Sequence, residues 1–500
     1  MERQVKHQLP YVQNLPNKQV RRRGVLTSCL SSKLLLKFIA QLAPLLLLPY
    51  SLDLQALSAK TTDIIQGTAP YFTFDSGKTK VTTTEDLLSI WLSDGTQITP
   101  SNNPSTPTNP INLPNAGDTL ADIDMMIPVS TNFILLSDLV THYHYWGDDD
   151  GDGLGTKGVI ATGSLSIRIT DKNNREINRS DALDICKAPY KMELNNIPGR
   201  LSTQYGVPSH SIFDYGTVTY YINPNLPPTV CYARPNLRYG TGGFKGADSI
   251  WDSDKGFIPQ STNPTLYGSN FPTTGADGLY FDLDIRGVDT NQLTWEPVTH
   301  EGITATVTRT TANDNWIPNY PEVVTRVTLT GPEARAQKDN VNPSRISKPN
   351  LPQTFELVGR DSDGNAVVKY GFVLRKWFIN RGDKSDTASN QVAWCRSLGY
   401  RLAQVKDLTN AVCSDVNVGN YCQDAVGATP SASDNFYQRQ MGAGFLTEWG
   451  EILDYADIDF TLWYWTSDTT GNLQFYVGVM GGGVGSYNPS YHYSGFCTTP

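Results

Sequence analysis

The fold of this chain is decided by three segments near its C-terminal end: VAWCRSLGYRLAQVKDL (392–408), GAGFLTEWGEILDYADIDF (442–460) and LWYWTSD (462–468). The first places a cysteine in a helical pattern, the second is rich in glycine and tryptophan, and the third is an aromatic strand. Another cysteine, Cys497, lies three residues from the end of the chain. These segments predict a small mixed domain without obvious reaction chemistry.

The first of these segments begins with helix signals. Asp386 or Thr387 can cap a helix, and Gly399 suits the C-terminal end of that helix. A second helix is expected after Val405. Strands are expected at 462–466, 473–479 and 494–497.

Strand patterns dominate the sequence before this domain. Alternating apolar residues predict strands with one buried face in SLSIRIT (164–170), TVTYYIN (217–223), LYFDLDI (279–285), ITATVT (303–308) and VVTRVTL (323–329). Asp282 and Asp284 alternate with the apolar positions of their strand, so we expect both to face solvent. Two further segments, TFELVG (354–359) and AVVKYGFVLRKWFI (366–379), predict a hairpin. The predicted fold class is mainly β, of the sandwich type, with a C-terminal α+β domain.

The charge is distributed unevenly along the 500 residues, whose net charge is −9. The first 59 residues hold eight of the 40 Lys and Arg residues and two of the 49 acids, which leaves a charge of −15 on the remainder. A negatively charged remainder repels phosphate groups, so we expect neither nucleic acid nor an anionic membrane surface as a partner.

The N-terminal 59 residues have the pattern of an export signal. A long basic stretch precedes the apolar run 34–48, and Leu57-Ser58-Ala59 offers a cleavage site. A twin-arginine signal at Arg22-Arg23, a lipoprotein site at Cys29 and an uncleaved anchor are weaker alternatives. We expect cleavage, a mature chain without a membrane span, and a secreted or cell-surface location, with the periplasm as the alternative.

Six cysteines follow the expected signal, an even number that suits an oxidising compartment. Cys186 and Cys231 lie in one region and are expected to pair. The other four permit three connectivities; they are Cys395, Cys413, Cys422 and Cys497.

Several long phrases resemble the invasin/intimin family of bacterial adhesins. HYHYWGDDDGDG (142–153), SIWDSDKGFIPQS (249–261) and NFPTTGADGLYFDLDIRG (270–287) resemble its adhesion domain, and 394–497 resembles its C-type lectin-like domain. The resemblance implies Ig-like and lectin-like domains and selects the pairs Cys395–Cys497 and Cys413–Cys422. The expected division is a signal at 1–59, a β/linker segment at 60–118, an adhesion domain at 119–335, an Ig-like connector at 336–380 and the lectin-like domain at 381–500.

The resemblance also implies a function. We expect a virulence-type adhesin that binds a host-cell surface protein or glycan and is not an enzyme. Larger members of the family carry an outer-membrane barrel before their Ig-like repeats. We expect this chain to lack one, so a separate invasin-type barrel is a possible export partner. A carbohydrate-binding module without calcium motifs, and a secreted enzyme that uses unrecognised carboxylates, remain alternatives.

One loop suggests a metal ion. Asp148, Asp150 and Asp152 match the first half of a calcium loop, although Val159 stands where a bidentate Glu belongs. A structural calcium ion is therefore one interpretation, and an acidic surface turn is the other; no other cofactor is expected. His142 and His144 could share a strand face and add metal ligands, or simply belong to an aromatic strand.

One short motif and a group of aromatic residues suggest contacts with a host. Arg381-Gly382-Asp383 is the integrin-recognition tripeptide and lies in a turn-like context, but a three-residue motif is weak evidence. The lectin-like region lacks the sugar-binding motifs of calcium-dependent lectins. Its middle offers the segment Glu448-Trp449-Gly450-Glu451 and the aromatic cluster Trp463, Tyr464 and Trp465. These suggest a flat sugar site or core packing, and we favour the core for Trp449 and Trp465. The receptor-binding residues are not apparent from sequence.

Overall fold

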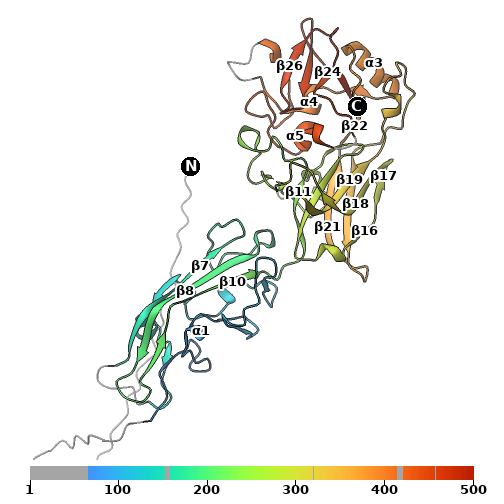
Figure 1. Cartoon of the computed structure of the whole chain (residues 1–500). Coiled ribbons are helices and arrows are strands. Elements are labelled where there is room, and N and C mark those ends of the chain that lie inside the picture. The colour runs from blue at the N-terminus through green and yellow to red at the C-terminus, as the bar shows by residue number, and fades with distance from the viewer. Residues whose placement is uncertain (1–65, 152–157, 319, 414–419, 456–457, 500) are drawn as a thin grey trace, which may run out of the picture. The chain divides into compact units, whose positions relative to one another are not determined.

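The computed structural model describes residues 66–151, 158–318, 320–413, 420–455 and 458–499 (Figure 1). The expected export signal at 1–59 therefore lies outside the described residues. Within the described ranges, no helix combines the length and the apolar character needed to cross a bilayer. The chain is mainly β, with a small helical contribution near its C-terminal end, as the sequence predicts.

The buried side chains form two cores. The first gathers residues between Phe72 and Ile222, and the second gathers residues between Val230 and Cys497. The segment 119–335, expected to be one adhesion domain, contributes strands to both cores. A disulfide between Cys186 and Cys231 joins the two regions covalently.

The first core lies under a six-stranded sheet. Its order is β4 (Ile111–Asn112), β10 (Gly216–Asn223), β8 (Tyr190–Ser202), β7 (Ile160–Thr170) and β5 (Phe133–Leu135), with β9 (His210–Phe213) beside β8. The smaller elements are β1 (Tyr71–Phe72), β2 (Ile90–Trp91), β3 (Gln97–Ile98), β6 (Trp146–Gly147), α1 (Thr84–Leu87) and α2 (Leu136–Thr141). The alternation expected in β7 is confirmed, because Leu165, Ile167 and Ile169 are buried.

The N-terminal part of the second core lies within a β-sandwich. One sheet has the order β12 (Trp251–Asp252), β13 (Gly256–Phe257), β11 (Thr229–Arg234), β15 (Tyr280–Arg286), β19 (Glu322–Thr330), β18 (Ile303–Ala312) and β17 (Val298–His300). The other consists of β16 (Thr294–Trp295), β20 (Gln353–Arg360) and β21 (Ala366–Leu374). Phe281 contacts Phe372 across the sandwich, with ring centroids 6.0 Å apart. The hairpin expected in an Ig-like connector thus supplies the inner face opposite the larger sheet.

One acidic residue of this sandwich lies where the sequence did not predict it. The expectation that Asp282 faces solvent is wrong, because its side chain is only 3% exposed. Arg234 and Arg326 stand opposite it on the two neighbouring strands, and Arg326 Nε donates to its carboxylate at 2.8 Å. Burial raises the pKa of Asp282, and the two guanidinium groups oppose that shift. The strand register therefore places two guanidinium groups beside the buried Asp282 carboxylate, and they offset the cost of burying its charge.

We call the expected lectin-like domain at 381–500 the lectin-like region. It is built around a second large sheet. Its order is β14 (Thr274–Ala276), β22 (Lys376–Asn380), β27 (Ser494–Thr498), β24 (Trp463–Thr470), β25 (Leu473–Gly478) and β26 (Val484–Tyr487), with β23 (Arg401–Leu402) beside β27. Helices α3 (Ala388–Leu398), α4 (Val405–Leu408) and α5 (Phe445–Trp449) accompany it. The Thr387 side chain caps α3, and Gly399 ends it in the left-handed conformation, as predicted.

Two buried charged residues connect this region to the sandwich. Arg439 donates to the backbone carbonyls of Arg238 at 2.6 Å and Tyr239 at 3.2 Å, and its guanidinium lies 4.6 Å from the Trp251 ring centroid. Glu448 in α5 accepts hydrogen bonds from Thr273 and Thr274 through their backbone N–H groups and hydroxyls. Both charged side chains are fully buried. The lectin-like region and residues 236–276 therefore fold as one core.

Replacing Glu448 by Gln tests this connection. The glutamine amide would direct N–H groups at donors that now point to a carboxylate. We expect the free energy of unfolding, measured by urea denaturation, to fall by about 3 kcal/mol. Glu451→Gln is the matched control: Glu451 is also buried and its backbone carbonyl accepts from Asn236 Nδ2 at 2.7 Å, but its Oε1 accepts no hydrogen bond from a described residue. A loss in that control as large as in Glu448→Gln would contradict this role.

Asp407 makes stability depend on pH. Burial alone would raise its pKa, but hydrogen bonds from Arg401, Lys376 and the Gln404 backbone outweigh burial and lower the pKa. A carboxyl whose pKa is lowered by folding stabilises the protein above its unfolded pKa, and that stabilisation is lost as the pH falls. Asp407→Asn should therefore cost about 3–5 kcal/mol at neutral pH, and the difference from the unmodified chain should shrink below about pH 4.

Urea denaturation at neutral and acidic pH measures both quantities. Asp363→Asn, in an exposed hairpin turn, is the control and should follow the unmodified chain at every pH. A pH profile of Asp407→Asn parallel to that of the unmodified chain would refute the assignment.

Candidate functional site

The outer face of β24, β25 and β26 carries a group of aromatic side chains. Successive residues of a strand point to opposite faces, so Tyr464, Phe475 and Val477 enter the core. The opposite face presents aromatic rings, and the turn before β27 adds more. We call this group the aromatic surface: Trp463, Tyr476, Tyr487, Tyr491 and Tyr493.

The rings of the aromatic surface form an unbroken series of contacts. The centroid distances are 5.3 Å from Trp463 to Tyr476, 4.9 Å from Tyr476 to Tyr493, 5.1 Å from Tyr493 to Tyr491 and 5.0 Å from Tyr491 to Tyr487. Trp463, Tyr487 and Tyr491 are 44%, 48% and 51% exposed, whereas Tyr476 and Tyr493 are half-buried. Aromatic rings are therefore both packed together and available to a partner.

Two glycines allow the rings to lie against the sheet. Gly478 stands opposite Trp463 and Gly485 opposite Tyr476 in the strand register. A Cβ atom would come within 2.7 Å of the Trp463 ring at Gly478 and within 2.4 Å of the Tyr476 hydroxyl at Gly485. A side chain at either position would thus displace the ring above it.

Two hydroxyl groups of this surface are partly buried. Burial raises the pKa of both Tyr476 and Tyr493, so both keep their protons near neutral pH. Beneath them, Trp465 is fully buried, with its ring centroid 4.7 Å from that of Tyr493. Its indole N–H donates to the Asp386 carbonyl at 3.1 Å. The surface can thus offer apolar ring area together with hydrogen-bond donors and acceptors.

The structure is incompatible with receptor recognition through Arg381-Gly382-Asp383. The Arg381 side chain is 1% exposed, and it donates to Gln391 Oε1 at 3.0 Å and to the Lys338 carbonyl at 2.9 Å. Its guanidinium also lies 5.0 Å from the Trp394 ring centroid. The arginine is therefore a core residue, and the turn-like context of the motif exposes Asp383 but not Arg381.

The core assignments of the two tryptophans are confirmed, because Trp449 and Trp465 are fully buried. Glu448, which belonged to the segment considered as a flat sugar site, is also fully buried. Of the aromatic cluster noted in the sequence, Trp463 alone is exposed. Four members of the aromatic surface were not predicted from the sequence: Tyr476, Tyr487, Tyr491 and Tyr493. The spacing of the tyrosines in YNPSYHY (487–493) was a usable signal for the last three.

The residues considered for calcium are only partly described. Asp148 and Asp150 precede a gap, and Asp152 lies outside the described residues. No group of three or more acidic, histidine or cysteine side chains in the described ranges could hold a metal ion. The shared strand face proposed for His142 and His144 is wrong, because α2 ends at Thr141 and His142 forms its C-terminal cap. Calcium binding at Asp148, Asp150 and Asp152 stays a prediction.

The structure brings the six cysteines together in pairs. The disulfides are Cys186–Cys231, Cys395–Cys497 and Cys413–Cys422. The second connects α3 to β27, so it joins the two ends of the lectin-like region. By the chain-entropy model, a loop of this length contributes about 4–5 kcal/mol.

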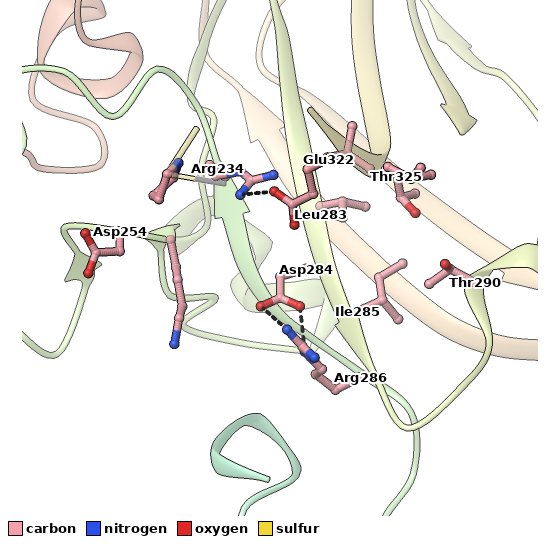
Figure 2. Close-up of a pocket in the computed structure, with 13 residues that line it drawn as sticks. Arg234, Asp254, Leu283, Asp284, Ile285, Arg286, Thr290, Glu322 and Thr325 are labelled. Atoms are coloured by element: carbon pink, nitrogen blue, oxygen red, sulfur yellow. Dashed lines mark hydrogen bonds and ion pairs between the residues drawn. The ribbon is translucent and has the colours of Figure 1, made fainter. Parts of the chain in front are cut away.

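A groove of about 530 Å³ lies on the sandwich sheet (Figure 2). Its carboxylates include Asp284 and Glu322, and each is paired with an arginine. Arg286 Nε lies 2.7 Å from Asp284, and an Arg234 nitrogen lies 3.0 Å from Glu322. Because both carboxylates are held in ion pairs, the groove does not present them as a free acid and base.

Comparison with known proteins finds similarity in solved structures alone. No family model and no curated protein matches the sequence. Invasin, a bacterial integrin-binding protein, is 13% identical over 69% of this chain and 52% of its own, with a TM-score of 0.33. A C-terminal intimin fragment in complex with the intimin-binding domain of its receptor Tir is 10% identical over 68% of this chain and 93% of its own, with a TM-score of 0.29.

The structural similarity to invasin and intimin expected from the sequence is therefore present. An intimin mutant from EHEC O157:H7 adds a third example, at 11% identity over 50% of this chain and 92% of its own, with a TM-score of 0.23. The chain spans about half the length of the invasin structure. Since similarity of this degree concerns the fold alone, the function must be argued from the residues of this chain.

Gly485→Ala tests the architecture of the aromatic surface. The added methyl group should displace the Tyr476 ring and lower the free energy of unfolding by about 1–3 kcal/mol. Urea denaturation measures the loss, and tyrosine NMR signals report the ring displacement. Ser486→Ala, on the opposite face of the same strand, is the control. It removes a buried hydroxyl that has no hydrogen-bond partner among the described residues, so we expect little change.

Proposed function

We propose that this chain is a bacterial adhesin of the secreted or surface-displayed, virulence-associated kind, and that its aromatic surface contacts a host-cell receptor. One observation carries the proposal: five aromatic rings from β24, β25, β26 and the turn before β27 are in continuous contact, and three of them are about half exposed. The three disulfides support a location outside the cytoplasm.

The composition of the surface suits recognition of another molecule. Tyrosine and tryptophan dominate the binding energy of protein interfaces, because each buries a large ring and loses little conformational freedom. A soluble chain gains nothing by leaving such rings open to water, since burying each would contribute about 2 kcal/mol or more. Their exposure in one continuous group therefore favours binding over a purely structural role.

A carbohydrate-binding module is the second candidate. Trp463 presents a ring whose inner side rests on Gly478, and a sugar ring can stack on an aromatic side chain held in this way. Testing the intact chain on a glycan array, with and without a chelator, would reveal such binding.

Truncation of the exposed rings tests the adhesin proposal. Trp463→Ala and Tyr491→Ala should each weaken binding to host cells about tenfold or more, because each removes a large exposed aromatic contact. Titration of the purified, disulfide-bonded chain onto cells measures the affinity, and thermal unfolding checks that each variant is folded.

Tyr205→Ala supplies the matched control. Tyr205 is 50% exposed, nearly as much as Tyr491, and it lies in the loop between β8 and β9, outside the aromatic surface. Its replacement should leave the affinity unchanged. If Trp463→Ala binds as tightly as the unmodified chain, or if no host cell binds the unmodified chain, the proposal is wrong.

A further inference from the structure

The aromatic surface lies in a stretch of chain that is almost free of charge. From Leu462 to Thr499 the chain contains one carboxylate, one histidine, and no lysine or arginine. That carboxylate, Asp468, is committed elsewhere: it accepts from the backbone N–H of Val405 at 2.7 Å and from Gln404 Nε2 at 3.2 Å. Within this stretch the one carboxylate already has partners, and an anionic sugar would find no lysine or arginine.

The ring geometry disfavours an extended glycan. Neighbouring rings along the series meet at interplanar angles of 88°, 53°, 65° and 76°. Successive sugar units stack well only where aromatic faces repeat in similar orientations. Here three of the four contacts are edge-to-face and the fourth is tilted, so the aromatic faces do not repeat in one orientation.

The segment that supplies Tyr487, Tyr491 and Tyr493 has a distinctive composition. GGGVGSYNPSYHY (481–493) combines tyrosine with glycine, serine and asparagine. Surfaces of this composition recognise folded proteins in antibody binding sites, where tyrosine supplies rigid contact area and the small polar residues supply adaptable hydrogen bonds. Tyr487 and Tyr491 are the exposed rings that this segment contributes.

We propose that the aromatic surface recognises an uncharged patch on a folded protein, with Trp463, Tyr487 and Tyr491 as its exposed aromatic contacts. This inference rests on the proposed function and specifies the chemistry of the partner. Affinity comes from ring burial and neutral hydrogen bonds, and charge attraction contributes little.

Salt dependence provides the first measurement. Raising NaCl from about 50 to about 500 mM shortens the Debye length about threefold, so association driven by opposite charges weakens strongly. For the intact chain on host cells we expect the affinity to change less than about threefold, because few charges are involved. A steep loss of affinity with salt would overturn the inference while leaving receptor binding itself intact.

Enzymatic treatment of the cells provides the second measurement. Protease treatment should abolish the binding that depends on Trp463, and removal of cell-surface glycans should not. Loss of binding after glycan removal overturns the inference in favour of a carbohydrate partner. Self-association that is lost in Trp463→Ala, without cell binding, identifies a second copy of this chain as the occupant and overturns it too. No binding to any cell rejects the proposed function itself.

Discussion

Arg439 and Glu448 are charged, fully buried and nine residues apart, and each is satisfied by groups from a distant part of the chain. The Arg439 guanidinium donates to carbonyls of residues 236–239, and the Glu448 carboxylate accepts from Thr273, Thr274 and the Gly442 backbone. Burial lowers the pKa of the first and raises that of the second. Neither charge could remain buried if the sandwich and the lectin-like region moved apart, because each would lose its partners.

The shared core follows from this constraint. Trp449, next to Glu448 in α5, donates its indole N–H to the Thr274 carbonyl and packs against Phe271 and Phe281 of the sandwich. Strand β14 adds main-chain pairing, because Thr274–Ala276 runs parallel to β22 in the sheet of the lectin-like region. The polar contacts set the alignment, and the aromatic packing supplies most of the apolar burial around them.

Local signals in the sequence predicted local structure well. Thr387 and Gly399 bound α3, and the alternation in β7 and β15 identifies the buried faces, because both depend on neighbouring residues alone. The errors arose where a distant residue decides the outcome. Arg381 looked like an accessible tripeptide until Gln391, Trp394 and the Lys338 carbonyl surrounded it, and Asp282 looked solvent-facing until Arg234 and Arg326 came into register beside it.

In the aromatic surface, too, neighbouring residues predict one feature and distant residues decide another. Trp463 was visible in the sequence, yet its exposure depends on strand order and register, which bring Gly478 beneath it and Tyr493 beside it. The core beneath this surface also holds its rings in position. Rings fixed on a sheet that is continuous with β22 and β14 lose little freedom when a partner arrives, so less of the contact energy is spent on ordering them. Under the proposed function, the rings of this surface would already be in place for a partner, because the buried charges that hold the core together also keep the sheet beneath the rings in position.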